Sequence, residues 1–321
     1  MQDEKHGHRL FPVALAAAGT ALMLLLAGCS SNSAGQASTT AAPVEVTAST
    51  DVYGDIAQTI GGDRIHVTPI IHSVSQDPHS YEATAQDKLA VSKAKVLIEN
   101  GGGYDDFFNT LVADNTTGDH RLINVTELSG LAPKAGTASP GAAPETQDFN
   151  EHLWYNFQTM TAAADAIAQE LSQVDPTGAS SYAANADRFK AELGKLQDRT
   201  AGLKASHEGE AVAITEPVPL YLLEAAGLVN KTPEEFSHAI EEGRDVPVTV
   251  LQETQNLITG KAVKILAYND QTEGPQTKKL KDTATAAGVP VVDFTETLPE
   301  GKNYLQWMGE NVDHLEKALQ P

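Results

Sequence analysis

Short apolar runs alternate with amphipathic segments along almost the whole chain after residue 43. Strands that alternate with helices at these lengths form mostly parallel sheets with both faces covered. The sequence therefore predicts an α/β protein with two Rossmann-like lobes, each built on a mostly parallel sheet. The strands that we expect are residues 44–48, 64–71, 95–99 and 121–125 in the first half and 211–215, 263–268 and 289–294 in the second half.

A long amphipathic segment over residues 178–205 separates the two halves. At a rise of about 1.5 Å per residue, a helix of this length would span about 40 Å. We expect it to be a long rigid backbone helix that joins the lobes. The predicted domains are an N-terminal lobe at 44–176, a bridging helix at 177–206 and a C-terminal lobe at 207–321.

Two local predictions concern helices. A helix that starts near Thr84 should turn Leu89 and Val91 inward, because both are apolar residues in an otherwise polar segment. Thr232-Pro233-Glu234-Glu235 matches a capping box, in which the threonine side chain would cap the helix that follows.

The first 28 residues have the features of a lipoprotein signal peptide. Lys5 and Arg9 precede an apolar run that ends in Leu26-Ala27-Gly28-Cys29. Cys29 would be acylated and would become the first residue of the mature chain, so we expect an extracytoplasmic protein anchored by lipid to the cell membrane. The alternative is an uncleaved transmembrane anchor, which also places the folded part outside the cytoplasm. Residues 29–43 are rich in Ser, Ala, Thr and Gly and predict a flexible tether.

Composition limits the chemistry of any binding site. Cys29 is the only cysteine, so the exported part has no disulfide and no thiolate site, and histidine and carboxylate are the metal ligands available. A mature chain of about 290 residues is long enough to bury a core without disulfides. The net charge of −21 argues against nucleic acid and anionic lipid as partners and favours cations.

Candidate metal ligands follow several of the apolar runs. His79 lies in a polar loop that Pro78 stiffens, and His152 immediately precedes a helix; a surface histidine without a role is the alternative for His79. Glu216 and Glu273 follow strands of the second half. Because ligands bind beyond the carboxyl ends of parallel strands, we expect these four side chains to converge on one cleft between the lobes.

These motifs resemble those of the zinc and manganese solute-binding proteins of ABC transporters. The resemblance rests on Asp77-Pro78-His79-x-Tyr81-Glu82, Asn100-Gly101, His152-x-Trp154, Glu216 with Ala226-Gly227-Leu228, and the acidic turn after Tyr268. It covers essentially the whole mature chain. In that family the metal lies between two α/β lobes joined by a rigid helix, and it is bound by two histidines, a third histidine or glutamate, and an acidic residue.

The resemblance implies His79, His152 and Glu216 as ligands of Zn²⁺ or Mn²⁺. The fourth position stays open between Glu273, which we favour, Asp270 and water. Because imidazoles must be neutral to coordinate, metal binding should weaken as pH falls through about 6. The implied function is capture of the ion for an ABC transporter permease by a monomer that is not an enzyme. The alternatives are an exported metallohydrolase, and a siderophore-binding protein or adhesin of the same architecture.

Overall fold

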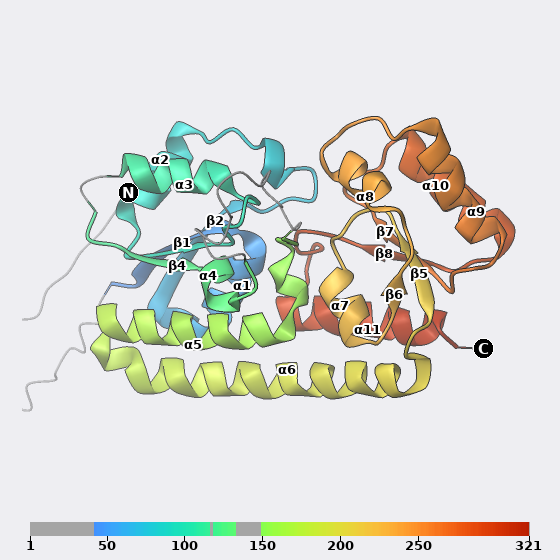
Figure 1. Ribbon diagram of the computed structural model, residues 1–321. Helices are drawn as coiled ribbons and strands as arrows, with labels where there is room; N and C mark the ends of the chain where they lie inside the picture. The colour runs from blue at the N-terminus through green and yellow to red at the C-terminus, as the bar shows by residue number, and fades with distance from the viewer. Residues whose placement is uncertain (1–41, 116–117, 133–148, 321) are drawn as a thin grey trace, which may run out of the picture. The chain divides into compact units, whose positions relative to one another are not determined.

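The computed structural model describes residues 42–115, 118–132 and 149–320 (Figure 1). The predicted signal peptide, Cys29 and nearly all of the predicted tether lie outside the described residues. In the part of the chain that is described, no helix combines the length and the apolar character needed to cross a membrane.

The first lobe is built on a four-stranded parallel sheet with the strand order β2-β1-β3-β4. Alternate residues of its central strands enter two different cores: Val96 and Ile98 pack beneath the sheet with helix α1, whereas Leu97 packs with α2 and α3. The sheet is therefore covered on both faces. Its elements are β1 (Val44–Thr50), α1 (Asp51–Gly61), β2 (Ile65–Ile71), α2 (Ala85–Lys93), β3 (Val96–Glu99), α3 (Asp106–Asp114), β4 (Arg121–Asn124) and α4 (Val125–Ser129).

The second lobe repeats this architecture with the strand order β6-β5-β7-β8, again all parallel. The prediction of an α/β fold with two parallel sheets is confirmed, although strand β6 was not predicted because it is only two residues long. The elements are β5 (Ala211–Ile214), α7 (Leu220–Ala225), β6 (Val229–Asn230), α8 (Glu234–Glu241), α9 (Val248–Thr259), β7 (Leu266–Asn269), α10 (Pro275–Ala287), β8 (Val291–Phe294) and α11 (Tyr304–Ala318).

Two long helices, α5 (Phe157–Val174) and α6 (Ala179–His207), connect the sheets (Figure 1). Helix α6 has 29 residues and packs against α1 and α5 of the first lobe and against α7 and α11 of the second. Its Phe189, Leu193 and Leu203 belong to one continuous apolar core that also contains Ile98 of β3 and Phe294 of β8. Burying this shared surface stabilises the two lobes together, since apolar burial contributes about 25 cal/mol per Å².

Two local predictions were right about the helix but wrong about one side chain each. The helix near Thr84 forms and Val91 is fully buried in the core with Leu97, but Leu89 is 52% exposed. The hydroxyl of Thr232 does not cap α8; it accepts a hydrogen bond from the backbone N of Ile214, and α8 begins at Glu234 without a side-chain cap. The Thr232 hydroxyl therefore bonds strand β5 instead of capping the helix that follows it in the sequence.

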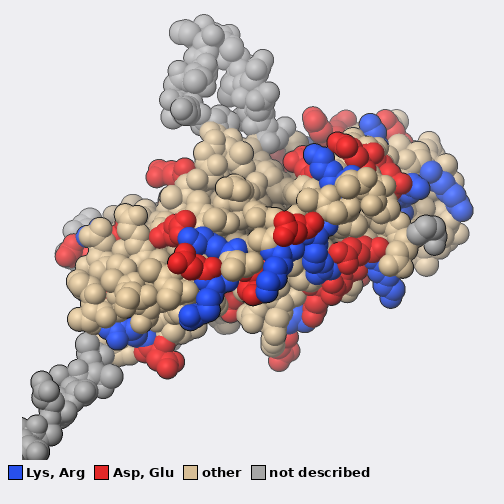
Figure 2. Space-filling model, turned by 90° about the horizontal axis from the view of Figure 1, so that it is seen from below, with Lys and Arg blue, Asp and Glu red and all other residues tan. Residues whose placement is uncertain are grey.

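The face that carries α6 has a mixed distribution of charge (Figure 2). Lys and Arg side chains lie beside Asp and Glu on this face rather than forming a continuous basic strip. Arg199 of α6, for example, donates to Glu316 at 2.8 Å, and Lys190 lies 2.5 Å from Asp165. Exposed pairs of this kind contribute little to stability, about 0–1 kcal/mol each. Their effect is to neutralise the cations locally.

Candidate metal centre

His79 lies in a single 3-10 turn, Pro78–Ser80, beyond the carboxyl end of β2. Asp77 caps this turn, because its Oδ1 accepts a hydrogen bond from the His79 backbone N at 3.0 Å and its Oδ2 accepts one from the Ser80 hydroxyl at 2.7 Å. The His79 ring packs edge-on against Tyr104, with ring centroids 5.3 Å apart. His79 therefore lies in the predicted loop, where Asp77 holds its backbone and Tyr104 packs against its ring.

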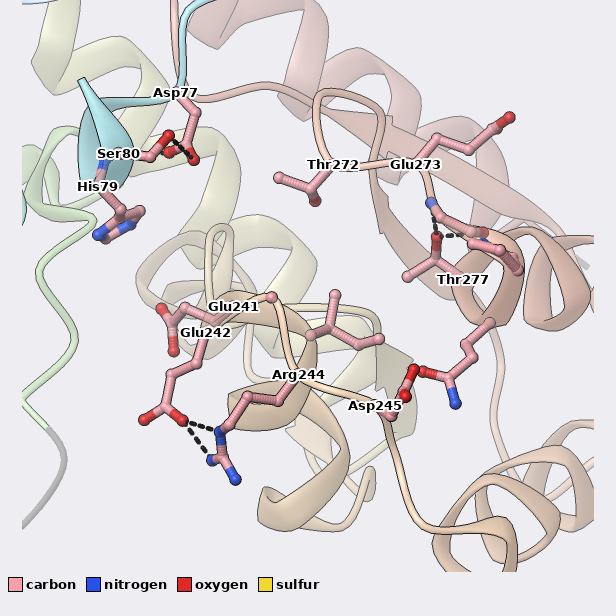
Figure 3. Close-up of a pocket in the computed structure, with 15 residues that line it drawn as sticks. Asp77, His79, Ser80, Glu241, Glu242, Arg244, Asp245, Thr272, Glu273 and Thr277 are labelled. Carbon is pink, nitrogen blue, oxygen red and sulfur yellow. Dashed lines mark hydrogen bonds and ion pairs between the residues drawn. The ribbon is translucent and has the colours of Figure 1, made fainter. Parts of the chain in front are cut away.

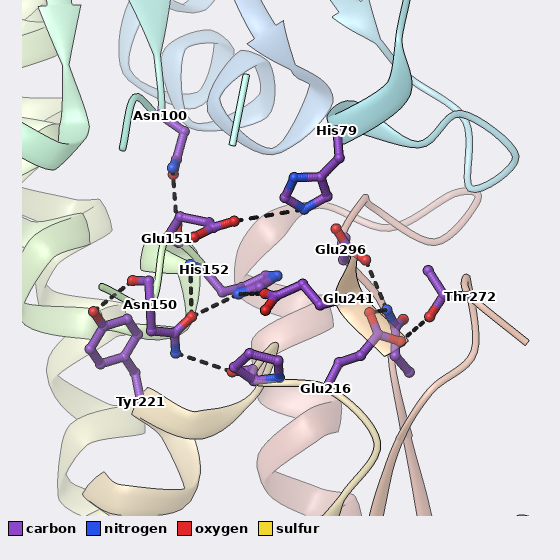
Figure 4. Close-up of polar contacts among 12 residues, drawn as sticks. His79, Asn100, Asn150, Glu151, His152, Glu216, Tyr221, Glu241, Thr272 and Glu296 are labelled. Carbon is purple, nitrogen blue, oxygen red and sulfur yellow. Dashed lines mark hydrogen bonds and ion pairs between the residues drawn. The ribbon is translucent and has the colours of Figure 1, made fainter. Parts of the chain in front are cut away.

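His152 is almost completely buried, with 1% of its surface exposed. Its Nδ1 lies 2.7 Å from Asn150 Oδ1, and the Asn150 side-chain nitrogen donates to Pro217 O at 3.1 Å (Figure 4). Asn150 Oδ1 must then be the acceptor, so His152 Nδ1 carries the proton and Nε2 is the nitrogen free to coordinate. The Trp154 ring packs against the imidazole with centroids 5.2 Å apart.

Two buried carboxylates come from the second lobe. Glu216 follows β5 and Glu296 lies two residues beyond β8, and each is 3% exposed. The Asn269 side-chain nitrogen donates to both, at 3.2 Å to Glu216 Oε2 and at 2.8 Å to Glu296 Oε1. The Thr272 hydroxyl donates to Glu216 Oε1, and Glu296 Oε2 is buried without a hydrogen-bond partner among the described residues.

Imidazole and carboxylate groups from both lobes meet at one point. One ligand atom each from His79, His152 and Glu296 lies within 4.8 Å of the other two. Glu216 is not one of these three residues, but Asn269 links it to the group, because the Asn269 side-chain nitrogen donates to both carboxylates. Two imidazole nitrogens with carboxylate oxygens form a mixed set that suits Zn²⁺, Mn²⁺ or Fe²⁺.

Burial shifts the pKa of each of these groups in the direction that favours its neutral form. It lowers the pKa of His79 and lowers that of His152 to well below its ordinary range, so both imidazoles are unprotonated near neutral pH. Burial raises the pKa of Glu216 to about 7, and burial together with the nearby Glu216 charge raises that of Glu296 to about 8. A cation that binds here must therefore displace protons from the carboxyls rather than from the imidazoles.

Two further carboxyls lie beside the imidazoles. Glu151 Oε1 is 3.7 Å from His79 Nε2, and Glu241 Oε1 is 4.0 Å from His152 Nδ1 (Figure 4). Burial raises the pKa of Glu151 to about 7, and burial followed by repulsion from Glu151, Glu216 and Glu296 raises that of Glu241 to about 9. The excess of carboxyl groups makes the surroundings of the imidazoles strongly favourable for a cation.

A cavity of about 560 Å³ leads from the surface to His79 and Glu241 (Figure 3). The loop that carries Asp77 and Ser80 lines its first-lobe side, and residues 240–245 and 272–277 line its second-lobe side. The cavity therefore gives a small cation access to the His79 imidazole from between the lobes.

Glu273, the predicted fourth ligand, does not lie among the close ligand atoms. The Glu273 carboxylate lines the outer cavity, where its Oε2 accepts a hydrogen bond from Tyr268 OH at 3.1 Å. Asp270 is turned toward Lys281 Nζ at 3.4 Å, and 56% of its side chain is exposed. Neither belongs to the group of close ligand atoms, whereas Glu296, which sequence reasoning missed, does. The signal for Glu296 was present, since it follows an apolar strand just as Glu216 does.

Comparisons with known proteins agree with this architecture. The sequence model of the family described as zinc-uptake complex component A, periplasmic, matches residues 46–318. The manganese-binding lipoprotein MntA of Halalkalibacterium halodurans is 26% identical over 250 residues, which cover 73% of this chain and 79% of that protein. The metal ABC transporter substrate-binding lipoprotein ScbA of Streptococcus cristatus is 25% identical over 314 residues, covering 92% and 94%.

Solved structures share the fold. The solute-binding protein FpvC of Pseudomonas aeruginosa, in complex with Mn²⁺, aligns with a TM-score of 0.70 and 22% identity over 86% of this chain and 98% of its own. The periplasmic zinc-binding protein TroA of Treponema pallidum aligns with a TM-score of 0.67 and 19% identity over 88% and 100%. The family match spans both sheets and all the ligand candidates of both lobes. The chain belongs to the family of periplasmic zinc-uptake component A proteins.

Proposed function

We propose that this protein is an extracytoplasmic receptor that captures a divalent transition metal ion and delivers it to an ABC transporter permease. The ligands that we propose are His79 and His152 from the first lobe side and Glu216 and Glu296 from the second. The observation that carries the proposal is the approach of His79, His152 and Glu296 ligand atoms to within 4.8 Å of one another.

The chemistry of the group supports a cation as cargo. No donor in the described part of the chain hydrogen-bonds the buried Glu296 Oε2, which is costly for a carboxylate unless a cation or a proton satisfies it. His152 is held by Asn150 in the tautomer that leaves Nε2 free, as is typical of metal-bound histidines. Zn²⁺ and Mn²⁺ both fit two nitrogens and two carboxylates.

The location and partners follow from the signal sequence and the family. In this proposal Cys29 carries the lipid that holds the protein at the outer face of the cytoplasmic membrane, and the protein acts as a monomer beside its permease. The ion reaches the site through the cavity lined by Asp77 and Glu273. The domain boundaries proposed from the sequence, at 176/177 and 206/207, fall next to the two ends of α6.

Metal content and uptake test the proposal together. We expect the protein, purified without chelators, to carry close to one equivalent of Zn²⁺ or Mn²⁺, and His152→Ala to carry little. A deletion strain should lose high-affinity uptake of that ion and regain it with the parental gene but not with His152→Ala. Equal metal content in parent and variant would refute the ligand assignment.

The receptor role also requires that the bound ion does not catalyse hydrolysis. We expect parental protein and His152→Ala to hydrolyse peptide, ester and phosphate substrates at the same background rate. Turnover that depends on His152 would instead support an exported metallohydrolase, since zinc sites of such enzymes activate water at an open position.

A further inference from the structure

The turn after β7 touches both second-lobe carboxylates, yet neither of its acidic neighbours, Asp270 and Glu273, joins the group of close ligand atoms. Asn269, at the end of β7, is 2% exposed and lies between Glu216 and Glu296. An amide nitrogen has two hydrogens, and here each is directed at a different carboxylate.

The Asn269 amide is fixed in this orientation by its own backbone surroundings. Its Oδ1 accepts a hydrogen bond from the Gln271 backbone N at 3.1 Å, so the nitrogen must face the carboxylates. Its backbone N donates to the hydroxyl of Thr215 at 2.9 Å, and Thr215 immediately precedes Glu216. The bond to Thr215 therefore fixes the position of Asn269 relative to Glu216, whose carboxylate accepts from the Asn269 amide.

The same turn holds the segment that carries Glu296. Gln271 Oε1 accepts hydrogen bonds from the backbone N of Glu296 and, at 2.8 Å, from that of Thr297. The Gln271 side-chain nitrogen donates to Val74 O of the first lobe at 3.3 Å. The backbone of Glu296 thus has little freedom to compensate for a change at Asn269.

These contacts hold the two carboxylates in different ways. Glu296 Oε1 is held by Asn269, whereas its Oε2 has no partner among the described residues. Glu216 has a donor on each oxygen, Asn269 on Oε2 and Thr272 on Oε1. A carboxylate with one oxygen fixed by a buried amide cannot rotate to place both oxygens equally near an ion.

We propose that Asn269 sets the coordination number of the bound ion by limiting Glu216 and Glu296 to one metal-bound oxygen each. This inference rests on the proposed function and adds a specificity-determining residue that does not itself touch the ion. Two imidazole nitrogens and two carboxylate oxygens give four ligands. Four-coordinate tetrahedral geometry suits Zn²⁺, whereas Mn²⁺ prefers six ligands that are mostly oxygen.

Removing the amide should release one oxygen of each carboxylate. In Asn269→Ala we expect the coordination number to rise and the ratio of Zn²⁺ to Mn²⁺ affinity to fall by roughly ten-fold, the lower end of the 10–100-fold effect of residues that orient metal ligands. Asn269→Leu has nearly the same size and no charge but lacks the two donor hydrogens. If Asn269 only filled space, this variant would behave like the parent; we expect that it does not.

Co²⁺ provides a direct readout of geometry, because four-coordinate Co²⁺ absorbs visible light strongly and six-coordinate Co²⁺ absorbs it weakly. We would record Co²⁺ spectra of the parent, Asn269→Ala and Asn269→Leu, with Zn²⁺ and Mn²⁺ affinities from chelator competition. A matched control is Asn311→Ala, which removes a buried asparagine of α11. We expect weaker absorption only in the two Asn269 variants.

The outcomes separate this inference from the proposed function. If His152→Ala binds Co²⁺ as the parent does, the proposed function fails. If His152→Ala loses Co²⁺ while both Asn269 variants keep the parental spectrum and selectivity, the inference alone is overturned. Should Asn269→Ala fail to fold, Asn269→Leu tests the same mechanism, because it also removes both donor hydrogens from Glu216 and Glu296. An unchanged spectrum and selectivity in that variant would overturn the inference equally.

Discussion

Proton competition at the carboxyls should control metal affinity over the physiological pH range. The pKa of Glu216 is about 7 and that of Glu296 about 8, so at pH 6 the first is protonated roughly ten times, and the second roughly a hundred times, more often than it is ionised. Burial lowers the pKa of both imidazoles, that of His152 furthest, so they add less proton competition than ordinary histidines would. Affinity must therefore rise with pH.

The expected change in metal affinity with pH follows from these populations of protonated and ionised carboxyls. Between pH 8 and pH 6, competition by protons should weaken binding about 50-fold through Glu296 and about ten-fold through Glu216, on the order of 500-fold together. Carboxyls at their ordinary pKa would be ionised throughout and would cause almost no change. The sequence predicts that binding weakens near pH 6 as histidines protonate, and the raised pKa values of the two carboxyls add the prediction of a loss that starts at higher pH, near 8.

Chelator competition at pH 6, 7 and 8, corrected for protonation of the chelator, measures this dependence. Glu296→Gln removes one titrating group, so its remaining change between pH 8 and 6 should be about ten-fold, on top of a weaker affinity at every pH. Glu273→Gln, in the outer cavity, is the control and should retain the full dependence. A parental affinity that changes less than about five-fold between pH 8 and 6 would refute the assignment of these carboxyls as proton-competing ligands.

Three further results are expected. His79→Ala and His152→Ala should each weaken metal binding by about 100-fold or more in the same competition assay, since loss of a residue that merely orients a ligand already costs 10–100-fold; near-parental binding by either would remove that histidine from the site. Glu296→Ala should weaken metal binding at least ten-fold, whereas Glu273→Ala and Asp270→Ala should change it by no more than about three-fold. The opposite ranking would indicate that the fourth ligand comes from the acidic turn after Tyr268. The metal-free protein should lose thermal stability as pH rises from 6 to 9, because buried carboxyls with raised pKa values bind protons more tightly in the folded than in the unfolded state; calorimetry should show that the ion abolishes this loss, and a metal-free protein that gains stability with pH would contradict it.

Strand ends could be located from sequence because apolar runs mark them, and this is why His79 and Glu216 could be selected. Apolar runs do not indicate which of the carboxylates beyond the strand ends turns toward the imidazoles. Glu273 and Glu296 both follow strands of the second lobe, but the turn after β7 directs Glu273 to Tyr268 and the segment after β8 directs Glu296 inward. The direction of a side chain in an irregular turn depends on contacts with distant residues, such as that between Gln271 and Thr297.

The fold was more predictable than its local details for a similar reason. Alternation of strands and helices is a property of many residues at once, so single exceptions do not change it. Leu89 and Thr232 are such exceptions. Leu89 lies on the solvent side of a helix whose inward position is taken by Val91, and Thr232 is used by a backbone N of β5 that local sequence cannot reveal.

The aromatic packing around His152 gives the protein an optical signal of its own. The chain contains only two tryptophans, and Trp154 lies with its ring 5.2 Å from the His152 imidazole, whereas Trp307 packs on Tyr155 at 5.6 Å. A Trp307→Phe protein would therefore emit from a single indole in contact with a proposed ligand. Changes at that imidazole would then alter its emission intensity, so that loading and unloading of the ion could be followed by stopped-flow fluorescence without any attached dye.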